Sequence, residues 1–135
     1  GGFIWVDDFW GAEAWDNFQV EMGQVLPPDQ FPIVDIPLSD PIFRAHYEIR
    51  QIPQIPSLQY WGATGGGISE RGPDSAEPHF RGIYGRHGNL MVVITHNTDI
   101  SDAWEREHDN KRYFFSFSQT GYSFGVNVVL YALTH

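Results

Sequence analysis

The stretch LMVVITHNTDISDAWE, residues 90–105, contains the feature that decides the fold. Its first six residues are apolar or β-branched without interruption, which is typical of a strand buried on both faces, as in a parallel sheet covered by helices. Polar residues then follow abruptly at His96, Asn97, Asp99 and Asp102. Ligands of open α/β sheets bind beyond the carboxyl ends of the strands. This loop is therefore the first candidate for a functional site.

A second short apolar strand is predicted at residues 3–6, and Asp7 and Asp8 end it. Apolar residues at helical spacing predict a helix over residues 12–25, which a pair of prolines at 27–28 stops. A strand followed directly by a helix is half of a βαβ unit, and this favours parallel pairing with the strand that begins at residue 90.

The sequence patterns that predict the remaining elements are weaker. Further strands are predicted at residues 32–36, 47–52 and 80–84. Asp40 and Pro41 are typical of the cap and first residue of a short helix, and residues 101–107 of a helical turn. A final helix from about Ser118 is apolar nearly all round and should be buried, so its polar Asn127 must find a partner. Gly121 and Gly125, one turn apart on this helix, would let another segment approach closely.

Composition excludes several classes of protein. The chain has 135 residues, enough for one domain with a core, and we treat residues 1–135 as a single α/β domain. A net charge of −9 with eight basic residues argues against nucleic-acid binding. The absence of cysteine excludes a disulfide scaffold and a cysteine nucleophile. No segment is apolar and long enough to span a membrane, and no signal peptide opens the chain.

If the strands at 3–6 and 90–95 are parallel, the polar loops after both lie at the same edge of the sheet. Carboxylates beside an imidazole are typical of an acid/base pair or of a site for a hard divalent cation. We predict catalytic roles for Asp8, His96 and Asp99. A divalent cation, if one is bound, would be held by Asp7, Asp8, His96 and Asp99. The predicted ligand-binding residues are Asp7, Trp10, Glu70, Arg71, Glu77, His79, Asn97, Asp102 and Trp104.

Each of these residues also has a purely structural interpretation. Asp7, Asp8 and Asp99 stand where helix caps are common, and His96 could serve as a buried hydrogen-bonding group. The glycine-rich residues 59–78 are either a flexible surface segment or a lid over the site. No spacing in the chain matches a known catalytic or phosphate-binding motif.

Four phrases of the chain resemble the bacterial domain-of-unknown-function family 4159. They are GGFIWVDDFW at residues 1–10, ERGPDSAEPH at 70–79, THNTD at 95–99 and GVNVVLYALT at 125–134. The resemblance extends over essentially the whole chain. It implies a relation to the class I glutamine amidotransferase-like fold, near its ThuA-like branch, that is, a flavodoxin-like three-layer sandwich with a mostly parallel sheet.

The resemblance further implies that the chain is the C-terminal part of a larger domain, with upstream strands missing and an intact protein that is exported. Amidotransferase activity does not carry over, because the cysteine nucleophile is absent.

Two classes of function remain open. The first is a binding domain for a small polar ligand, with carbohydrate as one class, or for a partner protein. The second is a hydrolase that uses a metal ion or an Asp–His pair. An interrupted sheet would also expose a strand edge, which a second copy of the chain or a complementing chain would cover.

Overall fold

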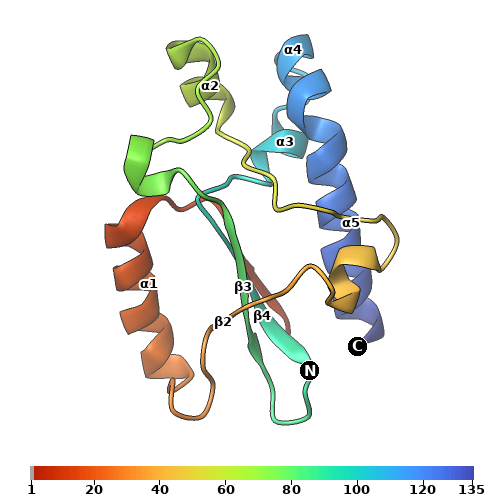
Figure 1. Ribbon diagram of the computed structural model, residues 1–135. Coiled ribbons are helices and arrows are strands. Elements are labelled where there is room, and N and C mark those ends of the chain that lie inside the picture. Colours follow the sequence, from red (N-terminus) through yellow and green to blue (C-terminus); the bar gives the residue numbers. More distant parts are fainter. Residues whose placement is uncertain (1) are drawn as a thin grey trace.

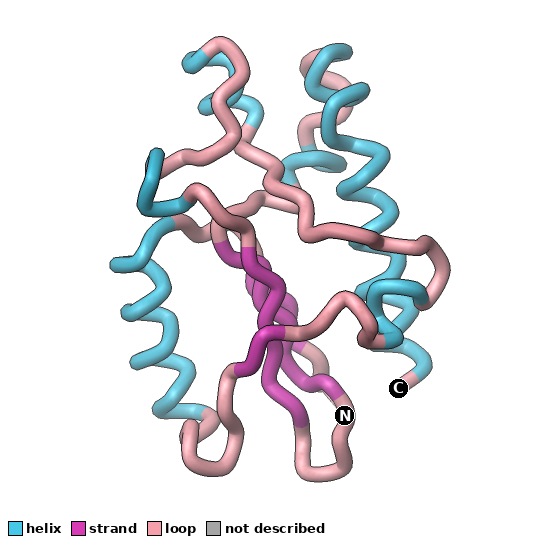
Figure 2. Tube along the Cα trace, in the orientation of Figure 1, coloured by secondary structure: helices cyan, strands magenta, loops and turns pink. Residues whose placement is uncertain are grey.

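The computed structural model describes residues 2–135 and has an α/β architecture. Strands β1 (Ile4–Val6), β2 (Val34–Asp35), β3 (His79–Tyr84) and β4 (Leu90–His96) form one sheet. Figures 1 and 2 show helix α1 (Gly11–Val25) on one side of the sheet and α5 (Gln119–Thr134) on the other. None of the helices in residues 2–135 is long and apolar enough to cross a membrane.

The sheet is mixed, with the order β1-β4-β3-β2. β1 and β4 are parallel, as predicted, with Trp5 opposite Val93. The β3–β4 and β2–β3 pairs are antiparallel, so a mostly parallel sheet is not confirmed. The physical reason is the short connection from β3 to β4. A turn at residues 85–89, closed by the Gly85 amide on the Asn89 carbonyl at 2.7 Å, can join antiparallel strands, whereas a parallel crossover needs a dozen residues or more.

Each face of the sheet has its own apolar core. Ile83, Val92 and Ile94 face α1 and pack against Trp15 and Phe18. The opposite face carries a larger core that includes residues of β3, β4 and α5. These residues are Phe80, Leu90, Val93, Phe124, Val128 and Tyr131. β4 is therefore buried on both faces, as its sequence predicts.

Six shorter helical elements complete the described part of the chain. They are η1 (Pro41–Arg44), α2 (Leu58–Thr64), η2 (Gly72–Ser75), α3 (Asp102–Glu105), α4 (Lys111–Tyr113) and a π-helical segment η3 (Phe114–Ser118) that leads into α5. Asp40 caps η1 by accepting from the Ile42 amide at 3.0 Å, as predicted. The strand predicted at residues 47–52 is absent, and prolines bound this segment. The glycine-rich residues 59–78 include most of α2 and all of η2, so half of them lie in helical turns.

The two predicted structural roles on α5 are confirmed. Asn127 is 2% exposed, and its amide oxygen accepts from the His46 and Tyr47 amides at 3.0 and 2.8 Å while its amide group donates to the Tyr47 carbonyl. Gly121 lies so close to α3 that an added Cβ would collide with Ala103. These contacts fix α5 against the loop that follows η1 and against α3.

Candidate functional site

The loops that follow β1 and β4 meet at one edge of the sheet, as the parallel pairing requires. Asp7 joins them: one carboxylate oxygen accepts from the Thr95 hydroxyl at 2.5 Å, and the other from the Ser101 amide at 2.8 Å. Burial raises the pKa of Asp7, although these hydrogen bonds act in the opposite direction. Both oxygens of Asp7 have partners, so its role is to hold the two loops together.

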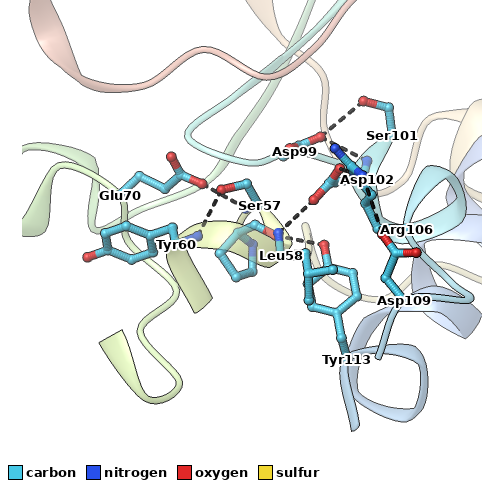
Figure 3. A network of polar contacts seen from close by, with 11 residues as sticks. Ser57, Leu58, Tyr60, Glu70, Asp99, Ser101, Asp102, Arg106, Asp109 and Tyr113 are labelled. Carbon is cyan, nitrogen blue, oxygen red and sulfur yellow. Dashed lines mark hydrogen bonds and ion pairs between the residues drawn. The ribbon is translucent and has the colours of Figure 1, made fainter. Parts of the chain in front are cut away.

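Asp99 and Asp102 organise the start of α3 (Figure 3). Asp99 Oδ1 accepts from the Asp102 amide at 2.9 Å and from the Ser101 hydroxyl at 3.0 Å. Asp102 Oδ2 accepts from the Leu58 amide at 2.6 Å, at the start of α2, and its other oxygen lies 3.6 Å from the Arg106 guanidinium. The cap interpretation of Asp99 therefore holds, and Asp102 links α3 to α2.

Carboxylates are concentrated around Asp99. Burial, reinforced by the charges of Asp8, Asp102 and Asp7, raises the pKa of Asp99 to about 7. Burial also raises the pKa of Asp8, and the negative charges of Glu70 and Asp102 raise it further. Asp8 adopts a left-handed backbone conformation, φ 58°, and accepts from the Trp10 indole at 3.0 Å. Its second oxygen accepts no hydrogen bond from residues 2–135, and neither does Asp99 Oδ2.

His96 lies on the other face of the sheet, among the rings of Phe9, Trp15 and His79 at centroid distances of 4.9, 5.2 and 5.7 Å. Its Nε2 is 3.0 Å from the Gly11 carbonyl, which can only accept, so Nε2 carries the proton. Nδ1 then accepts from the Arg81 guanidinium at 3.2 Å. Both ring nitrogens are engaged in a fixed tautomer.

The imidazole of His96 is kept neutral. Burial lowers its pKa to about 4, and the positive charge of Arg81 contributes in the same direction. Its ring nitrogens contact Arg81 and the Gly11 carbonyl, whereas the Asp8 carboxylate accepts from the Trp10 indole and is acted on by the charges of Glu70 and Asp102. The predicted grouping of His96 with Asp8 and Asp99 is therefore not what the structure assembles.

Asn97 connects three segments through its side-chain amide and its backbone amide. Its amide oxygen accepts from the Gly11 amide at 2.9 Å, its amide group donates to the Glu77 carbonyl at 2.8 Å, and its backbone amide donates to the Phe9 carbonyl at 2.9 Å. It is 3% exposed, with a left-handed φ of 62°. Asn97 therefore fixes the start of α1 from a buried position.

The other predicted ligand-binding residues are dispersed. Glu70 accepts from the Ser57 amide at 2.7 Å at the start of α2, and His79 stacks on His96 on the α1 face. Trp104 packs edge-on against Trp5 at 5.7 Å on the α5 face, in apolar surroundings. Within residues 2–135, no group of three or more His, Asp and Glu side chains is placed to hold a metal ion. The predicted cation-binding set is thus not brought together.

A polar cavity of about 450 Å³ does bring two predicted residues together, Trp10 and Arg71. Its other lining residues are Glu13, Ala14, Asn17 and Asp74. Asp74 also accepts from the Ala12 amide at 3.0 Å, at the start of α1. The sequence analysis did not single out these residues. Glu13 and Asn17 lie four positions apart on the polar face of the predicted helix, and this spacing could have indicated them.

The comparison with known proteins identifies the family. A model described as Domain of unknown function (DUF4159) matches residues 1–133. The chain belongs to this family. No curated protein and no solved structure matched. The DUF4159 match confirms the family resemblance of the sequence, whereas the relation to the amidotransferase-like superfamily is not shown.

Proposed function

We propose that this DUF4159 domain binds a small polar ligand of the carbohydrate class in the cavity at the start of α1, without catalysing a reaction. The observation that carries this proposal is the lining of the cavity. Arg71, Asn17, Glu13 and Trp10 line it, and their side chains carry a guanidinium, an amide, a carboxylate and an indole ring. Binding sites for small ligands combine such a concave shape with a few convergent polar groups and an aromatic ring.

The availability of Arg71 supports the proposal. Its side chain makes no ion pair and no hydrogen bond with residues 2–135, whereas its backbone amide is fixed by the Ser75 hydroxyl at 2.8 Å. Ser75 is fully buried. A guanidinium offers five donors in a planar fork, so Arg71 can bind vicinal hydroxyls or the carboxylate of an acidic sugar.

The separation of the polar groups supports binding over catalysis. His96 is neutral, engaged at both nitrogens and on the far face from Asp7. Asp7 and Asp102 accept backbone or hydroxyl hydrogen bonds that hold the loops. A general base must be within hydrogen-bond reach of the group that it activates, and the Asp–His pair of the hydrolase hypothesis lacks this arrangement.

One observation favours a second candidate, a hydrolase that depends on carboxylates alone. Burial and the neighbouring Asp8 raise the pKa of Asp99 to about 7, which is suited to a general acid at neutral pH. In this alternative Asp99 would donate a proton and Asp8, with one oxygen free of hydrogen bonds from residues 2–135, would act as the partner carboxylate.

Isothermal titration calorimetry with a panel of neutral and acidic mono- and oligosaccharides tests the binding proposal. We expect Arg71→Ala to weaken the affinity for the best sugar about 10- to 100-fold, because a charge-assisted hydrogen bond contributes about 1.5–3 kcal/mol. Arg112→Ala, an exposed arginine on α4, is the matched control and should bind like the wild type. Equal affinities of the Arg71→Ala variant and the wild type, or no binding by any sugar, would contradict the proposal.

The same sugars as p-nitrophenyl glycosides test the alternative. Release of p-nitrophenol by the wild type, lost in Asp99→Asn, would favour the hydrolase. Binding without release would favour the binding domain.

We also propose that the domain is the C-terminal part of a larger amidotransferase-like, flavodoxin-like domain. The parallel β1–β4 pair and the helices on both faces of the sheet support this proposal. The antiparallel β2–β3–β4 portion is an elaboration that such a fold would have to include.

A further inference from the structure

The polar cavity at the start of α1 is lined by charges of both signs. Its lining includes one basic residue, Arg71, and two acidic residues, Glu13 and Asp74, and its volume is about 450 Å³. This volume lies within the range of about 300–1,000 Å³ that is usual for sites of small ligands. The charges come from two segments, since Glu13 belongs to α1 whereas Arg71 and Asp74 belong to the glycine-rich residues 59–78.

The opposite charges of this lining do not neutralise one another. Arg71 forms no ion pair with Glu13 or Asp74. The side chains of Arg71, Glu13 and Asn17 form no hydrogen bond with any residue of the range 2–135, and all three residues are exposed. A guanidinium, a carboxylate and an amide are therefore available to a ligand in the same cavity.

The segment that carries Arg71 and Asp74 is already fixed. Asp74 Oδ2 accepts from the Ala12 amide at 3.0 Å, at the N-terminal end of α1, where the helix dipole favours a negative charge. The Arg71 amide donates to the hydroxyl of the fully buried Ser75 at 2.8 Å. A cavity whose backbone is held in this way loses less conformational entropy when a ligand binds.

We propose that the cavity selects an amino sugar that also carries a carboxylate, a zwitterion whose carboxylate binds Arg71 and whose ammonium binds Glu13. The second carboxylate, Asp74, adds to the attraction for the ammonium, and the Asn17 amide binds ring hydroxyls. This inference rests on the function proposed above and names the class of ligand for the same site.

The charges of the cavity favour a zwitterion over sugars of the other three charge types. A neutral sugar would cover the charges of Arg71 and Glu13 without pairing either, and removing an unpaired charge from water is costly. An acidic sugar would pair with Arg71 but meet the like charges of Glu13 and Asp74. A basic amino sugar would pair with Glu13 and leave Arg71 facing a like charge. A zwitterion meets an opposite charge at both places.

Isothermal titration calorimetry with four related sugars, at about pH 6 where their amino groups are protonated, tests the inference. Muramic acid carries both charges, N-acetylmuramic acid only the carboxylate, glucosamine only the ammonium, and N-acetylglucosamine neither. We expect muramic acid to bind at least about tenfold more tightly than either singly charged sugar, because each matched charge adds a charge-assisted hydrogen bond.

Two variants separate the two charges of the ligand. Glu13→Gln should remove the advantage of muramic acid over N-acetylmuramic acid and keep its advantage over glucosamine. Arg71→Gln should do the reverse. Asp16→Asn and Arg112→Gln, at exposed positions that do not line the cavity, are the matched controls and should keep both advantages. Circular dichroism of each variant establishes that it is folded.

Three results would overturn the inference. Equal affinities for the four sugars, or tighter binding of a singly charged sugar, would do so and leave the proposed binding function standing. So would an advantage of muramic acid that Glu13→Gln and Arg71→Gln leave unchanged. If none of the four binds, the inference fails, and the proposed function fails with it only when the wider panel of sugars also shows no binding.

Discussion

Replacing Asp99 by asparagine should stabilise the protein above neutral pH. Burial and the neighbouring carboxylates raise the pKa of Asp99 from 3.8 to about 7. Between these two pH values the folded state keeps a proton that the unfolded state has released, so the ionisation of Asp99 lowers the stability as the pH rises. At 1.36 kcal/mol per pH unit the full effect is about 4 kcal/mol. Asparagine keeps an oxygen to accept from the Asp102 amide and Ser101 hydroxyl, and it carries no charge.

The difference in the free energy of unfolding between Asp99→Asn and wild type is the quantity to measure, by urea denaturation from pH 4 to pH 8. This difference isolates Asp99 from His96. The pKa of His96 is lowered to about 4, so His96 favours unfolding as the pH falls below 6.5, but it does so in both proteins and its contribution cancels. We expect the difference to grow with pH and level off above about pH 7 at up to about 4 kcal/mol. Asp16→Asn, on the exposed face of α1, controls for the general loss of a negative charge. A difference independent of pH, or equal to that of Asp16→Asn, would refute the reasoning.

Three further changes should destabilise the fold, each read out by urea denaturation with circular dichroism. Asn127→Ala leaves two amides and a carbonyl of residues 46–47 without partners and should cost about 2–4 kcal/mol; a loss below about 1 kcal/mol would show that water replaces the side chain. Gly82→Ala would place a Cβ 2.9 Å from the Val92 carbonyl oxygen and should cost about 1–3 kcal/mol by overpacking; wild-type stability would mean that the sheet relaxes. Tyr113→Phe removes a buried 2.7 Å hydrogen bond to a backbone carbonyl and should cost about 1–2 kcal/mol; an unchanged midpoint would count against that contact.

Hydrophobic periodicity, and the residues that interrupt it, predicted the elements whose contacts are mostly local or that are buried throughout. The strand predicted from residue 90 is β4, and the helix predicted over residues 12–25 is α1 (Gly11–Val25). Residues 47–52 alternate weakly in polarity, and this suggested a strand. In the structure, the amides of residues 46–47 are bound by Asn127, a contact 80 residues away in the chain that no local pattern reveals.

The pairing of strands was predictable only in part. The βα unit at the start of the chain correctly indicated the parallel pair of β1 and β4. The antiparallel pair of β3 and β4 follows from the tight turn at residues 85–89. A turn this short makes the two strands that it joins antiparallel, because parallel neighbours require a long crossover. Turn length was therefore the better guide to the sheet than the apolar run of β4.

The geometry of β4 explains why the predicted site residues do not all lie together. Thr95 and His96 are consecutive in β4, and consecutive side chains of a strand point to opposite faces. Once Thr95 binds Asp7 on the α5 face, His96 must face α1, where Phe9 and Trp15 enclose it. Two loops can meet at the same edge of a sheet although their side chains point to opposite faces. The polar residues at the end of a strand therefore point alternately to the two faces of the sheet and form two separate groups. Here the carboxylates gather beyond the edge around Asp99, and the imidazole becomes part of the core beneath α1.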